Sequence, residues 1–258
     1  MNLLRVFFMI CFFTSCDRKQ NNSQLLESIN SISKVDTIYT FEIDELKNIA
    51  DTLSMQLVKK NDKGFKVYEE IITHSDDDLY IIKNYYGDDN KIFYTQKSTT
   101  NFGILSILET FKNEDNIISE GLQIFYEDNQ PYDTIFLNYS YRYKENRISM
   151  MNVDYTDSKK EVLGRLKTLY NDQGDPVEEF FIELNDTLTI TNYLYKSDVM
   201  YQTKTFDKKN SLTIIQEYKK DGVYEYLKSR RVFKDNKLSV EELSEKDSSG
   251  NILLLKRK

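Results

Sequence analysis

The chain has few residues that interrupt a β-strand, since only 2 of its 258 residues are proline and 8 are glycine. Proline removes a hydrogen-bond donor from the ladder and glycine weakens a strand interior, so their scarcity favours long paired strands. The reversals between strands must then depend on Asn, Asp, Ser and Lys. Hydrophobic residues make up 40% of the chain, which excludes wholesale disorder.

Residues that carry much of enzyme chemistry are also scarce: there is no Trp, one His and two Cys. A single His cannot build a zinc site, and it is the only imidazole base for nucleophilic catalysis. The chain shows no G-x-S-x-G elbow, no Walker A loop and no dinucleotide fingerprint. These absences predict a protein that is not an enzyme and uses no metal and no cofactor.

Charge and aromatic content narrow the choice of partners. The net charge is −7, and an acidic surface repels phosphate backbones, so we expect no nucleic-acid partner. The chain contains 19 Tyr and 15 Phe, and both residue types favour half-buried strands.

The N-terminus has the three-part organisation of a secretory signal peptide. Arg5 precedes the apolar run 6–13, and the small residues Thr14 and Ser15 follow it. This run is much shorter than the roughly 20 apolar residues of a membrane-spanning helix. Both cysteines, Cys11 and Cys16, lie in this segment, which leaves no disulfide framework for the exported protein.

Phe13-Thr14-Ser15-Cys16 resembles the lipobox of bacterial lipoprotein precursors, with Phe13 where Leu is usual. The resemblance implies cleavage before Cys16 and attachment of lipid to its thiol. It predicts a protein anchored to a membrane of the bacterial cell envelope, on the periplasmic face or at the cell surface. An ordinary signal peptide cut nearby is the alternative.

The remaining chain divides into a tether and one large domain. Residues 17–36 are polar and predict a flexible tether, in which Leu25, Leu26 and Ile29 allow at most a short amphipathic turn. Residues 37–258 predict an antiparallel β domain that begins with a strand at 38–43. Apolar residues spaced i, i+3, i+4, i+7 and i+11 from Leu46 predict one helix near 44–59, packed on the sheet.

A recurring turn organises the domain. Tyr170 to Val177 reads Tyr-Asn-Asp-Gln-Gly-Asp-Pro-Val, and Asn, Asp and Gly at its centre favour chain reversal. Looser clusters recur at 61–64, 76–78, 87–90, 113–116, 128–131, 144–146, 157–160, 185–186, 196–198, 207–210, 219–222, 234–237 and 247–251. The pattern resembles the tyrosine–aspartate repeats of Rhs-type proteins and the hairpin repeats of some antitoxin-like bacterial proteins, over residues 86–251.

Period-two alternation between these turns predicts antiparallel pairing. The fold class expected is mainly β: a long antiparallel meander of roughly a dozen strands. Such a sheet is expected as a curved open sheet or partial barrel, with the N-terminal helix packed on it. Closure into a barrel and an elongated single-layer solenoid are the alternatives, because open edges need protection.

Two groups of residues are candidate sites. His74 precedes Asp76-Asp77-Asp78, which suggests either a cation loop or a solvated acidic turn, although the EF-hand spacing is missing. Tyr139, Tyr141 and Tyr143 share one strand face with Ile135 and Leu137. That face is either a binding platform for sugars, peptides or another strand, or a ladder that stabilises the sheet.

Three functional hypotheses remain open. The first is a non-catalytic, membrane-anchored envelope lipoprotein that acts as a binding or interaction module. Its partner is another envelope protein or a toxin that it neutralises. The second is a carrier of lipid or another apolar ligand, in a cupped sheet with a covering helix. The third, a hydrolase with paired carboxylates in a cleft, has the least support.

Overall fold

The computed structural model describes residues 29, 32, 35–44, 48–75, 78–87, 91–113, 115–183, 186–197, 199–221 and 224–257. Its regular structure consists of strands. They are β1 (Asp36–Ile43), β2 (Ile49–Lys60), β3 (Lys66–Ser75), β4 (Asp78–Tyr86), β5 (Ile92–Thr99), β6 (Gly103–Lys112), β7 (Ile118–Glu127), β8 (Gln130–Lys144), β9 (Arg147–Thr156), β10 (Val162–Tyr170), β11 (Pro176–Glu183), β12 (Asp186–Lys196), β13 (Val199–Asp207), β14 (Leu212–Asp221), β15 (Tyr224–Lys234), β16 (Lys237–Lys246) and β17 (Ile252–Arg257).

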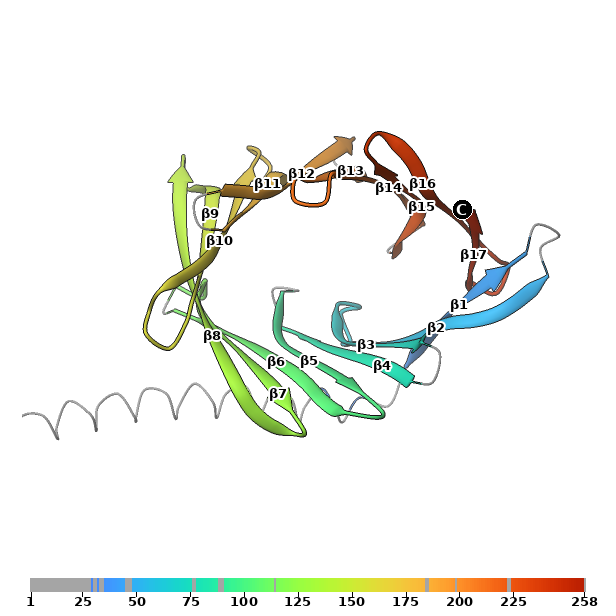
Figure 1. The fold of residues 1–258 in the computed structure, drawn as a ribbon, viewed down its shortest axis with the longest axis horizontal. Coiled ribbons are helices and arrows are strands. Elements are labelled where there is room, and N and C mark those ends of the chain that lie inside the picture. The colour runs from blue at the N-terminus through green and yellow to red at the C-terminus, as the bar shows by residue number, and fades with distance from the viewer. Residues whose placement is uncertain are drawn as a thin grey trace, which may run out of the picture.

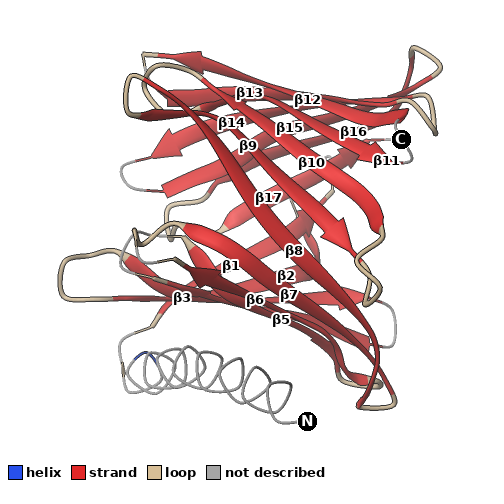
Figure 2. Ribbon diagram, turned by 90° about the vertical axis from the view of Figure 1, so that its left-hand side faces the viewer, coloured by secondary structure: helices blue, strands red, loops and turns tan. Residues whose placement is uncertain are grey.

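The 17 strands form one closed ring (Figures 1 and 2). Each strand pairs antiparallel with the next along the chain, from β1–β2 to β16–β17. The antiparallel meander is therefore confirmed, but the open or partial sheet is wrong because β17 pairs with β1. Closure removes both edges, each of which would have exposed a row of unpaired backbone groups.

The closing pair is parallel, as it must be when an odd number of alternating strands forms a ring. Phe41 lies opposite Leu253 and Ile43 lies opposite Leu255. The side chains reinforce this seam, because Lys256 Nζ lies 3.0 Å from Glu42 Oε2. Asn251 Oδ1 also accepts a hydrogen bond from the Tyr39 amide at 3.4 Å.

The helix predicted near residues 44–59 is wrong. Ile49–Lys60 is strand β2, which pairs with β1 on one side and β3 on the other. The same residues also alternate with period two: Leu53, Met55 and Leu57 share one face, and Ser54 and Gln56 share the other. Pairing on both sides of β2 overrides the helical spacing, of which Ile49, Leu53 and Leu57 also fit period two.

Five of the predicted turns adopt the same five-residue loop. In 171–175 the Asn171 amide donates to Asp175 O at 2.9 Å, and the Gly174 amide donates to Asn171 O at 3.0 Å. The Asn171 side-chain oxygen accepts from the amides of Gln173 and Asp175 at 3.0 and 2.8 Å. Gly174 has φ +90°, which favours glycine. The same backbone bonds close the loops 61–65, 113–117, 157–161 and 247–251.

Exposure separates the inner from the outer face of the ring. On β8, Leu137 is 4% exposed whereas its neighbour Phe136 is 42% exposed. Following the pairing from strand to strand places Leu137 on one face with Val58, Glu69, Val153 and Thr203, all of them buried. This is the inner face. Tyr139 and Tyr141 lie on it too, two and four residues after Leu137.

The ring has no central core. Only eight apolar side chains are buried in the described part of the chain. A closed sheet of 16 to 18 strands encloses more space than its side chains fill, so a lumen remains. The main apolar cluster lies outside the ring, where Ile29 and Ile32 pack against β3, β4 and β5. Its other members are Val67, Tyr68, Tyr85, Phe93 and Tyr94.

Within the described residues, no helix combines the length and the hydropathy that crossing a membrane would require.

Candidate functional site

Two cavities open at the same end of the ring. Because consecutive strands alternate in direction, the turns after even-numbered strands all lie at one end, which we call the cavity end. Both cavities are lined by residues of these turns and of the adjoining strand ends. The start of β1 at Asp36 lies at this end as well. β17 begins at the cavity end and ends at the opposite end of the ring.

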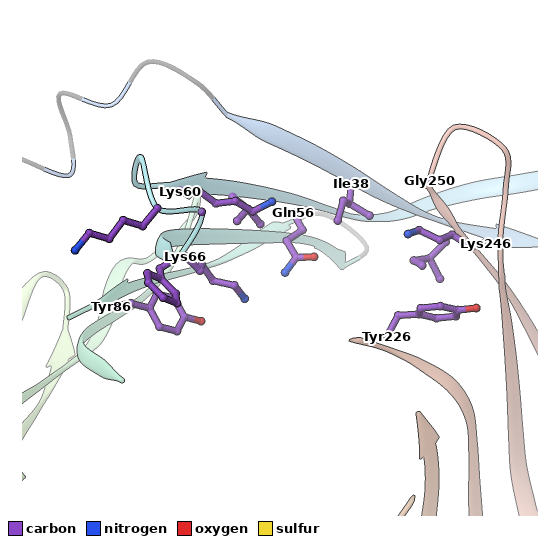
Figure 3. A pocket seen from close by; sticks show the side chains of 13 residues that line it. Ile38, Gln56, Lys60, Lys66, Tyr86, Tyr226, Lys246 and Gly250 are labelled. Carbon is purple, nitrogen blue, oxygen red and sulfur yellow. The ribbon is translucent and has the colours of Figure 1, made fainter. Parts of the chain in front are cut away.

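The first cavity, the seam cavity, lies where β17 meets β1 and has a volume of about 610 Å³. Its walls are apolar, and four lysines but no carboxylate contribute to its lining. The residues are Ile38, Gln56, Val58, Lys60, Lys63, Gly64, Phe65, Lys66, Tyr86, Tyr226, Lys246, Gly250 and Ile252 (Figure 3). The strands at both ends of the domain therefore build one site.

A buried carboxylate organises one wall of the seam cavity. Glu69, which is 7% exposed, accepts hydrogen bonds from Lys66 Nζ at 2.7 Å and Gln56 Nε2 at 2.6 Å. Tyr86 Oη and Asn84 Nδ2 also donate to it, at 2.8 and 3.1 Å. Burial would raise the pKa of Glu69, but the Lys66 ammonium and these hydrogen bonds outweigh burial and lower the pKa.

A β-bulge explains why Lys66 reaches Glu69. Residues three apart on a regular strand point to opposite faces. The β2–β3 register shifts between Lys59 and Lys60, so the extra residue Val67 turns Lys66 onto the inner face. The Lys66 ammonium then lies 5.2 Å from the centre of the Tyr86 ring.

Tyr226 closes the cavity from the opposite side. The β15 pairing with β16 starts at Ser229, so the residues of β15 before it have only β14 as a partner. Figure 1 shows this end of the β14–β15 hairpin bent into the ring. In Figure 3 Tyr226 lies across the cavity from Ile38 and Gln56.

The second cavity, the tyrosine cavity, has a volume of about 1100 Å³. Its lining is mainly aromatic and aliphatic, with Lys91 and Arg147 among its charged groups. The lining consists of Lys91, Ile92, Ile118, Tyr139, Tyr141, Tyr143, Asn146, Arg147, Ile148, Met151, Tyr170, Gln173 and Gly174. The tyrosine face singled out in the sequence is thus the wall of a cavity inside the ring.

The hydroxyls of Tyr139 and Tyr141 stay neutral at physiological pH. Burial, with a contribution from nearby Tyr155, raises the pKa of Tyr139 to about 12. Burial also raises the pKa of Tyr141, whose hydroxyl donates to the Ile118 carbonyl at 2.7 Å. These groups therefore act as hydrogen-bond donors and packing surfaces rather than as charged bases.

Glu179 is a second inner-face carboxyl, on β11. Burial raises the pKa of Glu179, against hydrogen bonds from Thr168 and Tyr193 that lower it. The Thr168 hydroxyl lies 3.4 Å from Glu179 Oε2. Unlike Glu69, this carboxylate has no cationic partner among the described residues, and its environment favours the protonated form.

The proposed cation loop is not assembled in the described residues. His74 lies exposed on β3 opposite Leu79, while Asp78 pairs with the following residue and so faces the other way. The Asp78 carboxylate accepts from the Thr100 hydroxyl at 2.6 Å and from the amides of Leu79 and Thr100 at 2.8 and 3.0 Å. Asp76 and Asp77 lie outside the described part, within which no three His, Cys, Asp or Glu side chains are grouped to hold a metal ion.

Other sequence predictions fall beyond the described residues or were not made. The signal peptide and Cys16 lie outside the described part of the chain. The Glu69 network was missed, because cross-strand partners 13 to 17 residues apart leave no local motif. The four lysines of the seam cavity were missed for the same reason.

No family model matches this chain, and no curated protein matches it. Among solved structures, a crystal structure of TcdB2–TccC3 aligns with 79% of this chain at 11% identity and a TM-score of 0.32. A Photorhabdus luminescens Tc holotoxin pore with a mutated TccC3 aligns with 77% at 10% identity and a TM-score of 0.14. The alignments cover 13% and 15% of those chains. Similarity this low supports no conclusion about fold or function.

Proposed function

We propose that this protein is a non-catalytic lipoprotein of the bacterial cell envelope that binds its ligand or partner segment in the lumen, through the cavity end. The observation that carries this proposal is the pair of cavities, of about 610 and 1100 Å³, that open at one end of a closed sheet. Ligand sites are typically concave and mostly apolar, and apolar surface exceeds polar surface in the lining of both cavities.

The side chains of the cavities support binding rather than chemistry. Tyr139 and Tyr141 remain neutral, and the Glu69 carboxylate is engaged by four donors. The sole histidine lies on β3 outside both linings, close to the turn at the opposite end of the ring.

A photo-crosslinking experiment tests the binding site. We would place p-benzoylphenylalanine at position 143, where Tyr143 lines the tyrosine cavity, and irradiate intact cells. Position 142 is the matched control, because Arg142 is the preceding residue of the same strand and points outward. An adduct of defined mass from position 143 but not 142 supports lumen binding. Equal adducts from both positions, or none from 143, contradict it.

The membrane anchor is tested separately. Cys16→Ala removes the thiol that the lipobox resemblance assigns to lipid, and two or three acyl chains suffice for stable anchoring. We expect the variant in the soluble fraction while the parent chain sediments with membranes. Retention of Cys16→Ala on membranes after washing with salt and carbonate would contradict lipid attachment.

Carriage of a lipid or other apolar ligand is the second candidate, now without the covering helix near 44–59. The aromatic and aliphatic lining of the tyrosine cavity favours it.

A further inference from the structure

The lining of the seam cavity combines apolar side chains with basic side chains. Ile38, Val58 and Ile252 supply apolar wall on β1, β2 and β17. The lysines Lys60, Lys63, Lys66 and Lys246 lie at strand ends or in the turn next to the opening. An apolar wall with basic groups toward the opening suits an anion that carries an apolar chain.

The charge of the seam cavity opposes the charge of the whole protein. The net charge of the chain is −7, yet the lining contributes four lysines and no carboxylate. Carboxylates beside the lining neutralise part of this charge. Among them, Asp36 lies 2.9 Å from Lys60 Nζ, and Glu69 lies 2.7 Å from Lys66 Nζ. Local field rather than net charge decides which ligand a cleft attracts.

Ile29 and Ile32 lie outside the ring at the same end. Ile29 and Ile32 pack on Val67, Tyr68 and Phe93. These three residues lie near the starts of β3 and β5, at the cavity end. Asp36 then begins β1 at the opening and forms the ion pair with Lys60. Ile29, Ile32 and Asp36 therefore all lie at the cavity end.

The position of Ile29 on the ring limits how far the cavity end can lie from a membrane that holds Cys16. Twelve residues separate Cys16 from Ile29. The 13 steps from Cys16 to Ile29 span at most about 45 Å when fully extended. The opening thus lies within reach of the bilayer surface.

From these observations we propose that the seam cavity binds an anionic lipid taken from the membrane that anchors the protein. The headgroup phosphate or carboxylate lies against the lysines at the opening, and an acyl chain enters between the apolar walls. The proposal rests on the lumen-binding function above and names its ligand class. No covalent step is involved.

The test uses the lipidated full chain in nanodiscs of phosphatidylcholine that contain a diazirine-labelled lipid. Phosphatidic acid and diacylglycerol with the same labelled chain differ only in the anionic headgroup. We expect phosphatidic acid to label peptides of the seam cavity about five to ten times more than diacylglycerol, as two ion pairs near a protein surface allow. Equal labelling by the two lipids would overturn the proposal.

Matched variants test whether labelling depends on the lysines of the seam cavity or on positive charge anywhere on the protein. The double substitution Lys63→Gln with Lys246→Gln should lower phosphatidic acid labelling about five-fold and leave diacylglycerol labelling unchanged. Lys209→Gln with Lys237→Gln removes the same charge at the opposite end of the ring and should have no effect. Equal losses in both pairs would contradict a local site. Thermal unfolding midpoints check that every variant is folded.

Two further arms identify the source of the anion and separate the two proposals. Inorganic phosphate should not displace phosphatidic acid, because the site also needs the acyl chain. Displacement by phosphate alone would assign the cavity to a soluble anion and overturn the lipid proposal. If neither lipid labels the cavity while position 143 still gives its adduct in cells, the lipid proposal fails and lumen binding stands.

Discussion

Glu42 and Lys256 form an ion pair of 3.0 Å across the seam, although 214 residues separate them along the chain. They lie on the only parallel strand pair among the described strands, β1 and β17. Both side chains are about one-third exposed, at 34% and 36%. The ion pair therefore spans the closing strand pair but contributes little to the stability of the ring.

The seam ion pair should contribute little to stability. A double-mutant cycle of Glu42→Gln and Lys256→Gln is expected to give a coupling free energy of about 0.5 kcal/mol at low salt, because exposed ion pairs are well solvated. Urea unfolding at two ionic strengths measures it. A coupling above about 2 kcal/mol would mean that closure depends on this pair.

The Glu69 network should contribute far more to stability than the Glu42–Lys256 ion pair. Glu69→Gln leaves the Lys66 ammonium without its carboxylate and is expected to cost about 2 kcal/mol at pH 7. Glu70→Gln is the matched control, because Glu70 lies on the outer face and is bonded to Tyr68 at 3.0 Å. We expect a loss below about 1 kcal/mol there. Equal losses in both variants would refute the special role of the inner carboxylate.

The stability provided by Glu69 should depend on pH with a defined sign. Its pKa is lowered in the folded state, so the unfolded chain binds the proton more readily. The difference in unfolding free energy between the parent chain and Glu69→Gln is therefore full above about pH 4.5 and shrinks as pH falls through the folded pKa. Chemical denaturation at pH 7, 5 and 3.5 follows it. A difference that grows on acidification would contradict the assignment.

Glu179 should show the opposite sign. Burial raises its folded pKa, so the folded state binds the proton more readily than the unfolded chain. Ionisation of Glu179 then weakens the fold as pH rises from about 4.5 through the raised value. Glu179→Gln keeps an acceptor for Thr168 and should stabilise the protein at pH 7 by up to about 1 kcal/mol. At pH 4 this gain should vanish, and destabilisation at pH 7 would show that the carboxylate is needed structurally.

The repeated loop gives a prediction about turn chemistry. Asn171→Ala removes the acceptor for two backbone amides and should cost about 1 to 2 kcal/mol. Gly174→Ala meets no atom within 4 Å, so its cost of about 1 kcal/mol comes from φ +90° alone. Thermal unfolding of both variants tests this. Gly174→Asn is a useful comparison, because Asn tolerates positive φ better than Ala.

The sequence contains the turns and the alternation but not the closure of the ring. Asn171 and its equivalents act within five residues, so their pattern predicts the reversals directly. The reversal at Thr100-Asn101-Phe102 went unnoticed, since its hydrogen bonds come from Asp78, 22 and 23 residues away. Likewise the β1–β2 reversal was hidden by apolar spacing that fits a helix.

Long-range pairing also decided the candidate sites. Tyr139, Tyr141 and Tyr143 were recognised because one strand carries them all. Lys60 and Lys246, which line the seam cavity together, are 186 residues apart, and only the β17–β1 pairing brings them to one opening. No property of either local segment indicates that meeting.

The parallel seam has a practical consequence for engineering. Because β1 begins at the cavity end and β17 finishes at the other, a fluorescent protein or an affinity handle fused after residue 257 would sit far from both openings. Circular permutation is harder for the same reason. A linker that joins the old ends would have to run the height of the ring, about 30 Å for a strand of nine or ten residues, whereas a meander with an even number of strands would need only a short loop.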